Sequence, residues 1–217
     1  MTATEVITLA KAGELRQLSP AIVDNNGVLL GFINLGMIEL YKRFALKTDE
    51  AIITLVDGKT VYKLDGTDTD VSMGEPFMYL IAAYEDGSEN DYNASALSIP
   101  INEEDNIYSI NTVSYNSVQI PLITQGAYIS LIYAAKPIKL TLDTLNNEID
   151  LPDQMIEPLL HYIGYRAHGS MDAKIQTESN THYMRFEASC NKIKELGIGV
   201  SPDDIDMKNR LSLKGFV

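Results

Sequence analysis

Two long segments near the two ends of the chain carry apolar residues at every third or fourth position, which predicts amphipathic helices. Residues 25–44 keep this spacing over four turns. A second helix is predicted to begin at about Leu151, because Asp150 precedes it and Pro152 suits a first helical turn. Its apolar stripe consists of Met155, Ile156, Leu159, Leu160, Ile163 and Ala167. Both helices are therefore expected to bury one face.

Two weaker patterns complete the predicted helices. Thr4 can cap a helix that runs to about residue 18. Residues 170–196 place apolar side chains at steps of three and four, and Gly197 is expected to end that helix. Both ends of the chain are thus predicted to be helical.

Glycine and proline lie inside the two long predicted helices. Gly31 and Gly36 each cost roughly 1 kcal/mol relative to alanine in a helix interior. We therefore expect each of them to allow close packing against another element. Pro158 removes a backbone donor, so a kink or a short first turn over 152–157 is expected, with the regular helix starting near Pro158.

Between the helical segments, the hydrophobic pattern changes to the alternation that is typical of strands. Residues 51–56 and 60–64 flank Asp57-Gly58, which is the strongest hairpin signal in the chain. Further strands are predicted at 77–84, 96–101, 107–113, 117–121 and 127–135. Short strands separated by polar loops predict a compact β-sandwich or barrel.

This order of elements predicts an α+β fold, in which segments from the N- and C-termini form a helical core that carries an inserted antiparallel β-sandwich or barrel. The expected limits are 1–48 with 141–197 for the helical core and 49–140 for the β-domain. Residues 198–217 would form a C-terminal docking tail, because a solvated tail has no reason to end in apolar side chains. Those side chains are Leu211, Leu213, Phe216 and Val217.

The net charge of −13 is concentrated in one part of the chain. Residues 49–110 hold 14 acidic side chains against Lys59 and Lys63. Affinity for nucleic acid requires clustered Lys and Arg, so sequence-specific DNA binding is not expected.

The stretch 106–135 contains no charged residue. Pro121, Gly126 and several polar side chains interrupt it, and its alternation is typical of strands rather than of a transmembrane helix. Cys190 is the only cysteine, so the chain forms no internal disulfide. The N-terminus lacks the basic and apolar regions of a secretory signal. No membrane association is predicted.

The three histidines do not have the spacing of a metal site. His161 and His168 are seven residues apart, nearly two helical turns, and would need a third element to share an ion. No Cys/His pair has zinc-site spacing either. The sequence therefore predicts no metal and no cofactor, and His182 is given no role.

Residues 65–70, DGTDTD, are similar to the start of a calcium loop. The ligand order and the closing glutamate are absent, so a solvated hairpin loop is expected. The chain contains no G-x-S-x-G, HExxH or P-loop pattern, and no nucleophile, base and orienting residue can be assembled from its scattered side chains. The chain is therefore not expected to be an enzyme.

Tyr162, Tyr165 and Arg166 lie beside the apolar stripe of the predicted 151–167 helix. They either fill the flanks of that helix or mark a subunit interface, where Tyr and Arg are enriched. The sequence alone leaves both interpretations open.

Three segments resemble bacteriophage head-to-tail adaptor (connector) proteins, including the tail tubular A-like adaptors of short-tailed phages. They are INLGMIELYKRFALKTDEAII (33–53), NSVQIPLITQGAYISLIYAAKP (116–137) and LDTLNNEIDLPDQMIEPLLHYIGYRAH (142–168). The resemblance runs from about Asn25 to Gly197.

This resemblance implies a non-enzymatic virion protein in the neck between capsid and tail, assembled in the bacterial host cytoplasm. Such proteins form homo-oligomeric rings, typically dodecamers, that join the portal to the tail and ring proteins while DNA passes through the centre. The uncharged stretch 106–135 and the C-terminal tail are candidates for subunit contacts. The alternative function is that of a β-sandwich module that binds carbohydrate or a receptor.

Overall fold

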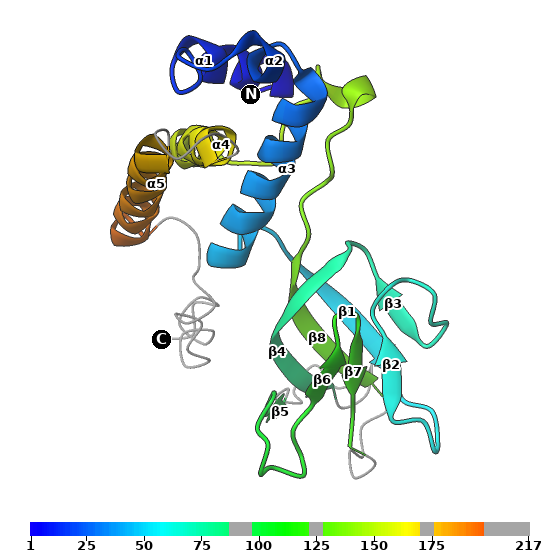
Figure 1. Cartoon of the computed structure of the whole chain (residues 1–217). Helices are drawn as coiled ribbons and strands as arrows, with labels where there is room; N and C mark the ends of the chain where they lie inside the picture. Colours follow the sequence, from blue (N-terminus) through cyan, green and yellow to red (C-terminus); the bar gives the residue numbers. More distant parts are fainter. Residues whose placement is uncertain (87–96, 122–127, 170–175, 198–217) are drawn as a thin grey trace. The chain divides into compact units, whose positions relative to one another are not determined.

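The computed structural model describes residues 1–86, 97–121, 128–169 and 176–197, which belong to two compact units. One unit, the helical unit, contains Met1–Leu46 and the helices that follow Pro137 (Figure 1). The other, the β unit, contains the described residues of Lys47–Lys136. Each unit has its own buried hydrophobic cluster.

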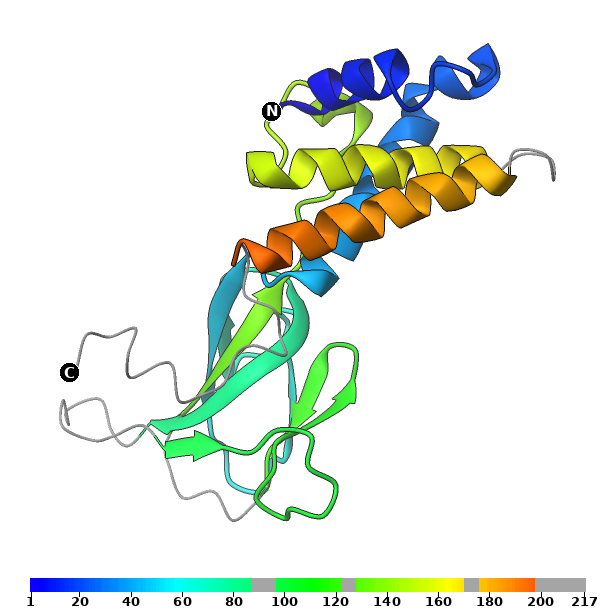
Figure 2. The ribbon, with the colours of Figure 1, turned by 90° about the vertical axis from the view of Figure 1, so that its left-hand side faces the viewer.

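The helical unit is built around α4. Its elements are α1 (Ala3–Ala12), α2 (Pro20–Val23), α3 (Asn26–Arg43), the 3-10 turns η1 (Leu142–Thr144) and η2 (Asp153–Met155), α4 (Ile156–Gly169) and α5 (Gln176–Glu195). Helix α4 contacts α1, α3 and α5, and Figure 2 shows α4 and α5 side by side. Helices from both ends of the chain therefore share one core.

The apolar stripes of α3 and α4 face that core, as their spacing predicts. Of the six predicted α4 positions, only Leu160 is not fully buried. A Cβ added at Gly36 of α3 would lie 2.6 Å from Leu159 Cδ1 and 3.1 Å from Tyr162 Cδ1. The glycine thus allows α3 to approach α4 closely. The same expectation is wrong for Gly31, because a Cβ there would meet no atom within 4 Å.

The first helix is capped by Thr2 and not by Thr4, and it spans Ala3–Ala12 instead of reaching about residue 18. Thr2 Oγ1 accepts a hydrogen bond from Glu5 N at 3.2 Å, and Glu5 Oε2 accepts one from Thr2 N at 2.8 Å. This capping box satisfies two helix-start donors at once, which a cap at Thr4 would not. Thr4 Oγ1 instead donates to the backbone oxygen of Leu145 at 3.0 Å.

The predicted helix start at about Leu151 is wrong, whereas the expected short first turn, followed by a regular helix that starts near Pro158, is confirmed. A 3-10 turn occupies Asp153–Met155, and α4 begins at Ile156. Pro158 is therefore the third residue of α4. The first four N–H groups of a helix have no partner within it, so the missing donor of this proline costs no hydrogen bond.

Side-chain to backbone hydrogen bonds join the N-terminal helices to the segment that precedes α4. The Asn34 amide donates to the Leu140 oxygen at 2.9 Å and accepts from the Leu140 nitrogen at 2.8 Å. Tyr41 Oη donates to the Asp150 oxygen at 2.7 Å. These bonds connect positions more than one hundred residues apart, which makes the helical unit a single body.

The β unit consists of two antiparallel sheets. Its strands are β1 (Thr48–Thr54), β2 (Val61–Lys63), β3 (Val71–Met73), β4 (Phe77–Asp86), β5 (Leu97–Ile99), β6 (Asn111–Ser114), β7 (Ser117–Gln119) and β8 (Tyr128–Ala135). The strand orders are β3-β1-β8-β4-β5 and β2-β7-β6. Side chains from both sheets form one buried cluster, which is the arrangement of a sandwich.

Strands β1 and β8 carry the chain into and out of the β unit, and they lie side by side. All seven residues of β1 pair with β8, from Thr48 with Ala134 to Thr54 with Tyr128. The two connections to the helical unit therefore start from adjacent positions, as an inserted domain requires. Strand β8 is central and buried along most of its length. This explains why the stretch 106–135 carries no charge here.

The predicted hairpin of 51–56 with 60–64 is wrong. The turn exists, since Lys59 N donates to the Val56 oxygen at 3.0 Å and Gly58 has φ of 75°. The strands on its two sides nevertheless join different sheets, because β1 pairs with β3 and β8 whereas β2 pairs with β7. The turn at Asp57-Gly58 was therefore predicted correctly, but the pairing of the strands on its two sides was not.

The other strand predictions agree with the structure to within a few residues, with two exceptions. Residues 107–110 are not a strand, because β6 begins at Asn111, and β3 was not predicted. The fold class is confirmed as α+β, with helices of both chain ends packed together and antiparallel sheets between them in the sequence. Among the described residues, no helix is long and apolar enough to span a bilayer.

Candidate functional site

Of the predicted interface residues of α4, Tyr162 and Tyr165 lie against α5 inside the helical unit. The Tyr162 ring is 5.3 Å from that of Phe186 and 5.8 Å from that of Tyr165, measured between centroids. Tyr162 and Tyr165 are half-buried, and Arg166 is exposed. Burial raises the pKa of Tyr162 above its ordinary value. Much of the two tyrosine surfaces thus packs within the unit, and an intersubunit role of all three residues stays a prediction.

Arg43 of α3 fixes this aromatic group from its other side. Its guanidinium lies 4.7 Å from the Phe186 ring centroid, and its two terminal nitrogens donate to the Glu187 carboxylate at 2.7 Å each. Glu39 accepts from Arg43 Nε at 3.0 Å. Hydrogen bonding to Arg43 lowers the pKa of Glu187. A bidentate pair of this kind has a defined geometry, so it holds α3 and α5 in register.

The other predicted interface residues, Leu211, Leu213, Phe216 and Val217, lie outside the described part of the chain. The uncharged stretch 106–135 can be traced further. Among its described residues, four large apolar side chains are half or more exposed, in a segment that we call the 107–115 surface. They are Ile107 (73%), Tyr108 (60%), Val113 (50%) and Tyr115 (79%).

The 107–115 surface lies on and next to β6, which is an edge strand of the smaller sheet. Its neighbours along the chain are the exposed acidic residues Glu103, Glu104 and Asp105. Large apolar side chains that are exposed on and beside an edge strand are typical of a protein–protein contact. The absence of charge in 106–135 indicated this region in the sequence, but alternation alone did not separate its buried positions from its exposed ones.

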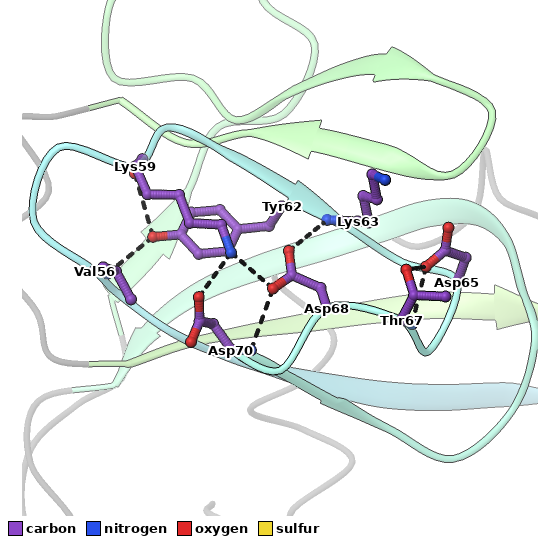
Figure 3. A network of polar contacts seen from close by, with 8 residues as sticks. All are labelled: Val56, Lys59, Tyr62, Lys63, Asp65, Thr67, Asp68 and Asp70. Carbon is purple, nitrogen blue, oxygen red and sulfur yellow. Dashed lines mark hydrogen bonds and ion pairs between the residues drawn. The ribbon is translucent and has the colours of Figure 1, made fainter.

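The aspartates of the 65–70 loop bind a lysine rather than water alone. Lys59 Nζ lies 2.7 Å from Asp68 Oδ1 and 2.7 Å from Asp70 Oδ2 (Figure 3). The ammonium also lies 4.7 Å from the Tyr62 ring centroid, and Tyr62 Oη accepts from Val56 N at 3.0 Å. The Asp68 side chain is only 9% exposed. The expected solvated loop is therefore partly buried and closed by an ion pair.

The ionisation of Asp68 depends on this arrangement. Burial by itself would raise the pKa of Asp68, but hydrogen bonds from Lys59 Nζ and from the backbone nitrogens of Lys63 and Asp70 outweigh it and lower the pKa overall. A carboxylate with a lowered pKa stabilises the fold above its ordinary pKa of about 3.9, and that contribution is lost as the pH falls through the lower folded value.

We expect Lys59→Met to raise the pKa of Asp68, because burial remains while the ammonium that stabilises the carboxylate is gone. Acid unfolding of the β unit should then begin at a higher pH. The measurement is an NMR titration of the aspartate carboxyl carbons. Lys63→Met is the matched control, since Lys63 reaches Asp68 through its backbone nitrogen. An unchanged Asp68 titration in Lys59→Met would contradict the assignment.

The histidines lie closer together than their sequence spacing indicates. His161 Nδ1 is 3.2 Å from Glu14 Oε1, and His182 Nδ1 is 2.8 Å from Glu14 Oε2. The His168 and His182 rings stack with centroids 4.8 Å apart. A shared ion would require a side chain from another element. Two elements meet this requirement, because the segment after α1 contributes Glu14 and α5 contributes His182. No local pattern could have revealed this, because Glu14 is 147 positions from His161.

The family model described as SU10 adaptor protein matches residues 1–206. No curated protein matches the chain. The matched span includes all helices and strands of both units.

Proposed function

This chain belongs to the SU10 adaptor protein family, a family of phage head–tail adaptors, and from this premise we propose that its copies form a closed ring that joins the portal to the tail. The adaptor is a structural protein of the virion. In the proposal, the ring is a dodecamer in the neck between capsid and tail, assembled in the bacterial host cytoplasm. Its partners are the portal protein and the tail and ring proteins of the same virion.

The observation that carries this proposal is the 107–115 surface. Its members include Tyr115 and Ile107, the two most exposed large apolar residues among those described. Exposed large apolar side chains on and beside an edge strand are available to a partner protein. Copies of one chain can cover this surface if it meets a different surface on the next copy, and such head-to-tail contacts close into rings. Each contact would need to bury more than about 1,000 Å².

The acidic segment has a role in the proposed ring. Residues 49–110 carry 14 acidic side chains and two lysines. If this segment faces the channel, it repels DNA phosphates over a Debye length of about 8 Å at physiological salt. DNA then passes without adhering and without sequence-specific contacts.

The C-terminal segment 198–217 has a docking role in the proposal. Its apolar residues Leu211, Leu213, Phe216 and Val217 would insert into a neighbouring virion protein. Tyr162, Tyr165 and Arg166 would contribute to subunit contacts through the parts of their side chains that α5 leaves uncovered. A carbohydrate- or receptor-binding module is not proposed, because the family match spans the helical unit as well as the β unit.

Negative-stain electron microscopy tests this proposal. The purified chain, alone and mixed with the portal of the same phage, should give ring-shaped particles whose class averages show one subunit number. Because an adaptor can stay monomeric until it meets the portal, the mixture is the decisive sample. A chain that forms no ring and also fails to co-sediment with the portal would overturn the proposal.

A further inference from the structure

Three side chains from distant parts of the sequence converge inside the helical unit. Glu14 follows α1, His161 lies on α4 and His182 lies on α5. One ligand atom of each lies within 4.8 Å of those of the other two. The two Nδ1 atoms approach the two oxygens of the Glu14 carboxylate, at 3.2 Å and 2.8 Å. Two imidazoles and a carboxylate are therefore directed at one small volume.

The Nδ1 atoms of the two histidines are buried and lack hydrogen-bond partners among the described residues. His182 is 9% exposed, and the Nδ1 atoms of His161 and His182 have almost no exposed surface. Despite the short distances to Glu14, neither nitrogen makes a hydrogen bond of acceptable geometry within the described part of the chain. Buried ring nitrogens are normally hydrogen-bonded. Unbonded nitrogens beside a carboxylate are explained if the nitrogens and the carboxylate are ligands of one cation.

The distances agree with the size of a metal ion. Zinc binds histidine nitrogen and carboxylate oxygen at about 2.0–2.2 Å, so ligand atoms that share one ion lie roughly 3–3.5 Å apart. The nitrogen–oxygen distances, 3.2 Å to Oε1 and 2.8 Å to Oε2, involve different oxygens of Glu14, and the three ligand atoms lie within 4.8 Å of one another. Small side-chain shifts therefore place all three around one ion. Two histidines and one glutamate also form the ligand set of several zinc sites in which a fourth position is open to water.

The surrounding residues hold this group in place. A Cβ at Gly164 would lie 2.8 Å from His182 Nδ1 and 3.0 Å from its Cγ, so only glycine leaves room for the imidazole. His168 stacks on His182, and its Nε2 lies 3.0 Å from the backbone oxygen of Glu14. Burial lowers the pKa of His182, and a neutral imidazole is the form that binds metals.

We propose that Glu14, His161 and His182 bind a divalent transition metal of the zinc class. The ion would join α4, α5 and the segment after α1, and the fourth position would hold water. This site has no part in the proposed ring contacts. It predicts that the folded chain is more stable with metal than without it, because an ion that binds only the folded state stabilises that state.

The test uses the untagged full-length chain, treated with EDTA and dialysed. Calorimetric titration with Zn²⁺ should give one site per chain, and Zn²⁺ should raise the melting temperature. Co²⁺ should give the visible absorption of a nitrogen- and oxygen-ligated ion. Glu14→Gln and His161→Gln should each weaken Zn²⁺ binding at least tenfold. Two variants are used so that poor folding of one leaves the other to decide.

Glu178→Gln is the matched control. Glu178 is 51% exposed and lies 3.2 Å from His168 Nδ1, so this variant removes a nearby carboxylate that is not a proposed ligand. It should bind Zn²⁺ like the unchanged chain. The proposal fails if no saturable binding occurs at micromolar Zn²⁺, or if Glu178→Gln loses as much affinity as Glu14→Gln. The first result would leave the cluster as a histidine–carboxylate group without metal, and the second would show that the bound metal has other ligands.

Discussion

Replacing Leu159 with alanine is expected to lower the free energy of unfolding by about 2–5 kcal/mol. Leu159 is 0% exposed and packs in the core that α3, α4 and α5 share. Its Cδ1 occupies the space left by the missing side chain of Gly36, where an added Cβ would lie 2.6 Å away. Alanine would therefore open a cavity at the closest contact of two helices. Urea unfolding followed by the helical circular dichroism signal measures the change.

Leu160→Ala is the matched control for this prediction, because the side chain is the same and Leu160 is only half-buried. It should cost clearly less than Leu159→Ala. A change below about 0.5 kcal/mol in Leu159→Ala would show that the buried face of α4 is assigned wrongly.

The double variant Ile107→Ser with Tyr115→Ser is expected to weaken ring assembly by about 100-fold per contact. Full burial of one large apolar side chain is worth about 1.5–3 kcal/mol, and 1.4 kcal/mol corresponds to a tenfold change in affinity. Both residues are more than 70% exposed, so their replacement should leave the folded chain unchanged. Analytical ultracentrifugation, with and without the portal, measures the assembled fraction.

Met184→Ser supplies the comparison, since Met184 is 72% exposed and lies on α5 in the other unit. It should assemble like the unchanged chain. Equal assembly of the double variant and the unchanged chain would remove the 107–115 surface from the proposed contact.

Strongly periodic segments were predicted correctly because their structure depends on neighbours in the sequence. The pattern of 25–44 indicated α3, which spans Asn26–Arg43 with Asn25 as its cap. The buried stripe of α4 was also correct, and Gly197, with φ of 66°, follows the end of α5 as expected. Each of these features is decided within one or two helical turns.

Predictions were wrong where the local sequence was compatible with two structures of similar stability. Thr2 and Thr4 are both good cap residues, and the glutamate at position 5 favours Thr2 through a capping box. Asp57-Gly58 makes a turn, yet a turn does not determine the ladder that each flanking strand joins. Strand β2 pairs with β7 more than fifty residues away, because this register buries Tyr62 and Val118 in the common core.

The candidate sites also combine features that local sequence indicates with features that only tertiary packing decides. Absence of charge marked 106–135 in the sequence, but only the strand order placed β8 in the centre of a sheet and left Ile107 and Tyr115 in water. The metal prediction from sequence considered histidines on one helix. It could not include Glu14 and His182, because side chains of different helices meet only after those helices pack.

For this protein, the sequence alone determined the helical ends, the strand-rich centre, the buried faces of the main helices and the family resemblance, since periodicity and local motifs encode all of these. Tertiary structure decided which strands pair, that β1 and β8 lie side by side, that Lys59 pairs with both Asp68 and Asp70, and that Glu14 meets two histidines. These contacts join residues whose proximity depends on the burial of a whole core. That burial is a property of the packed chain and not of any one segment.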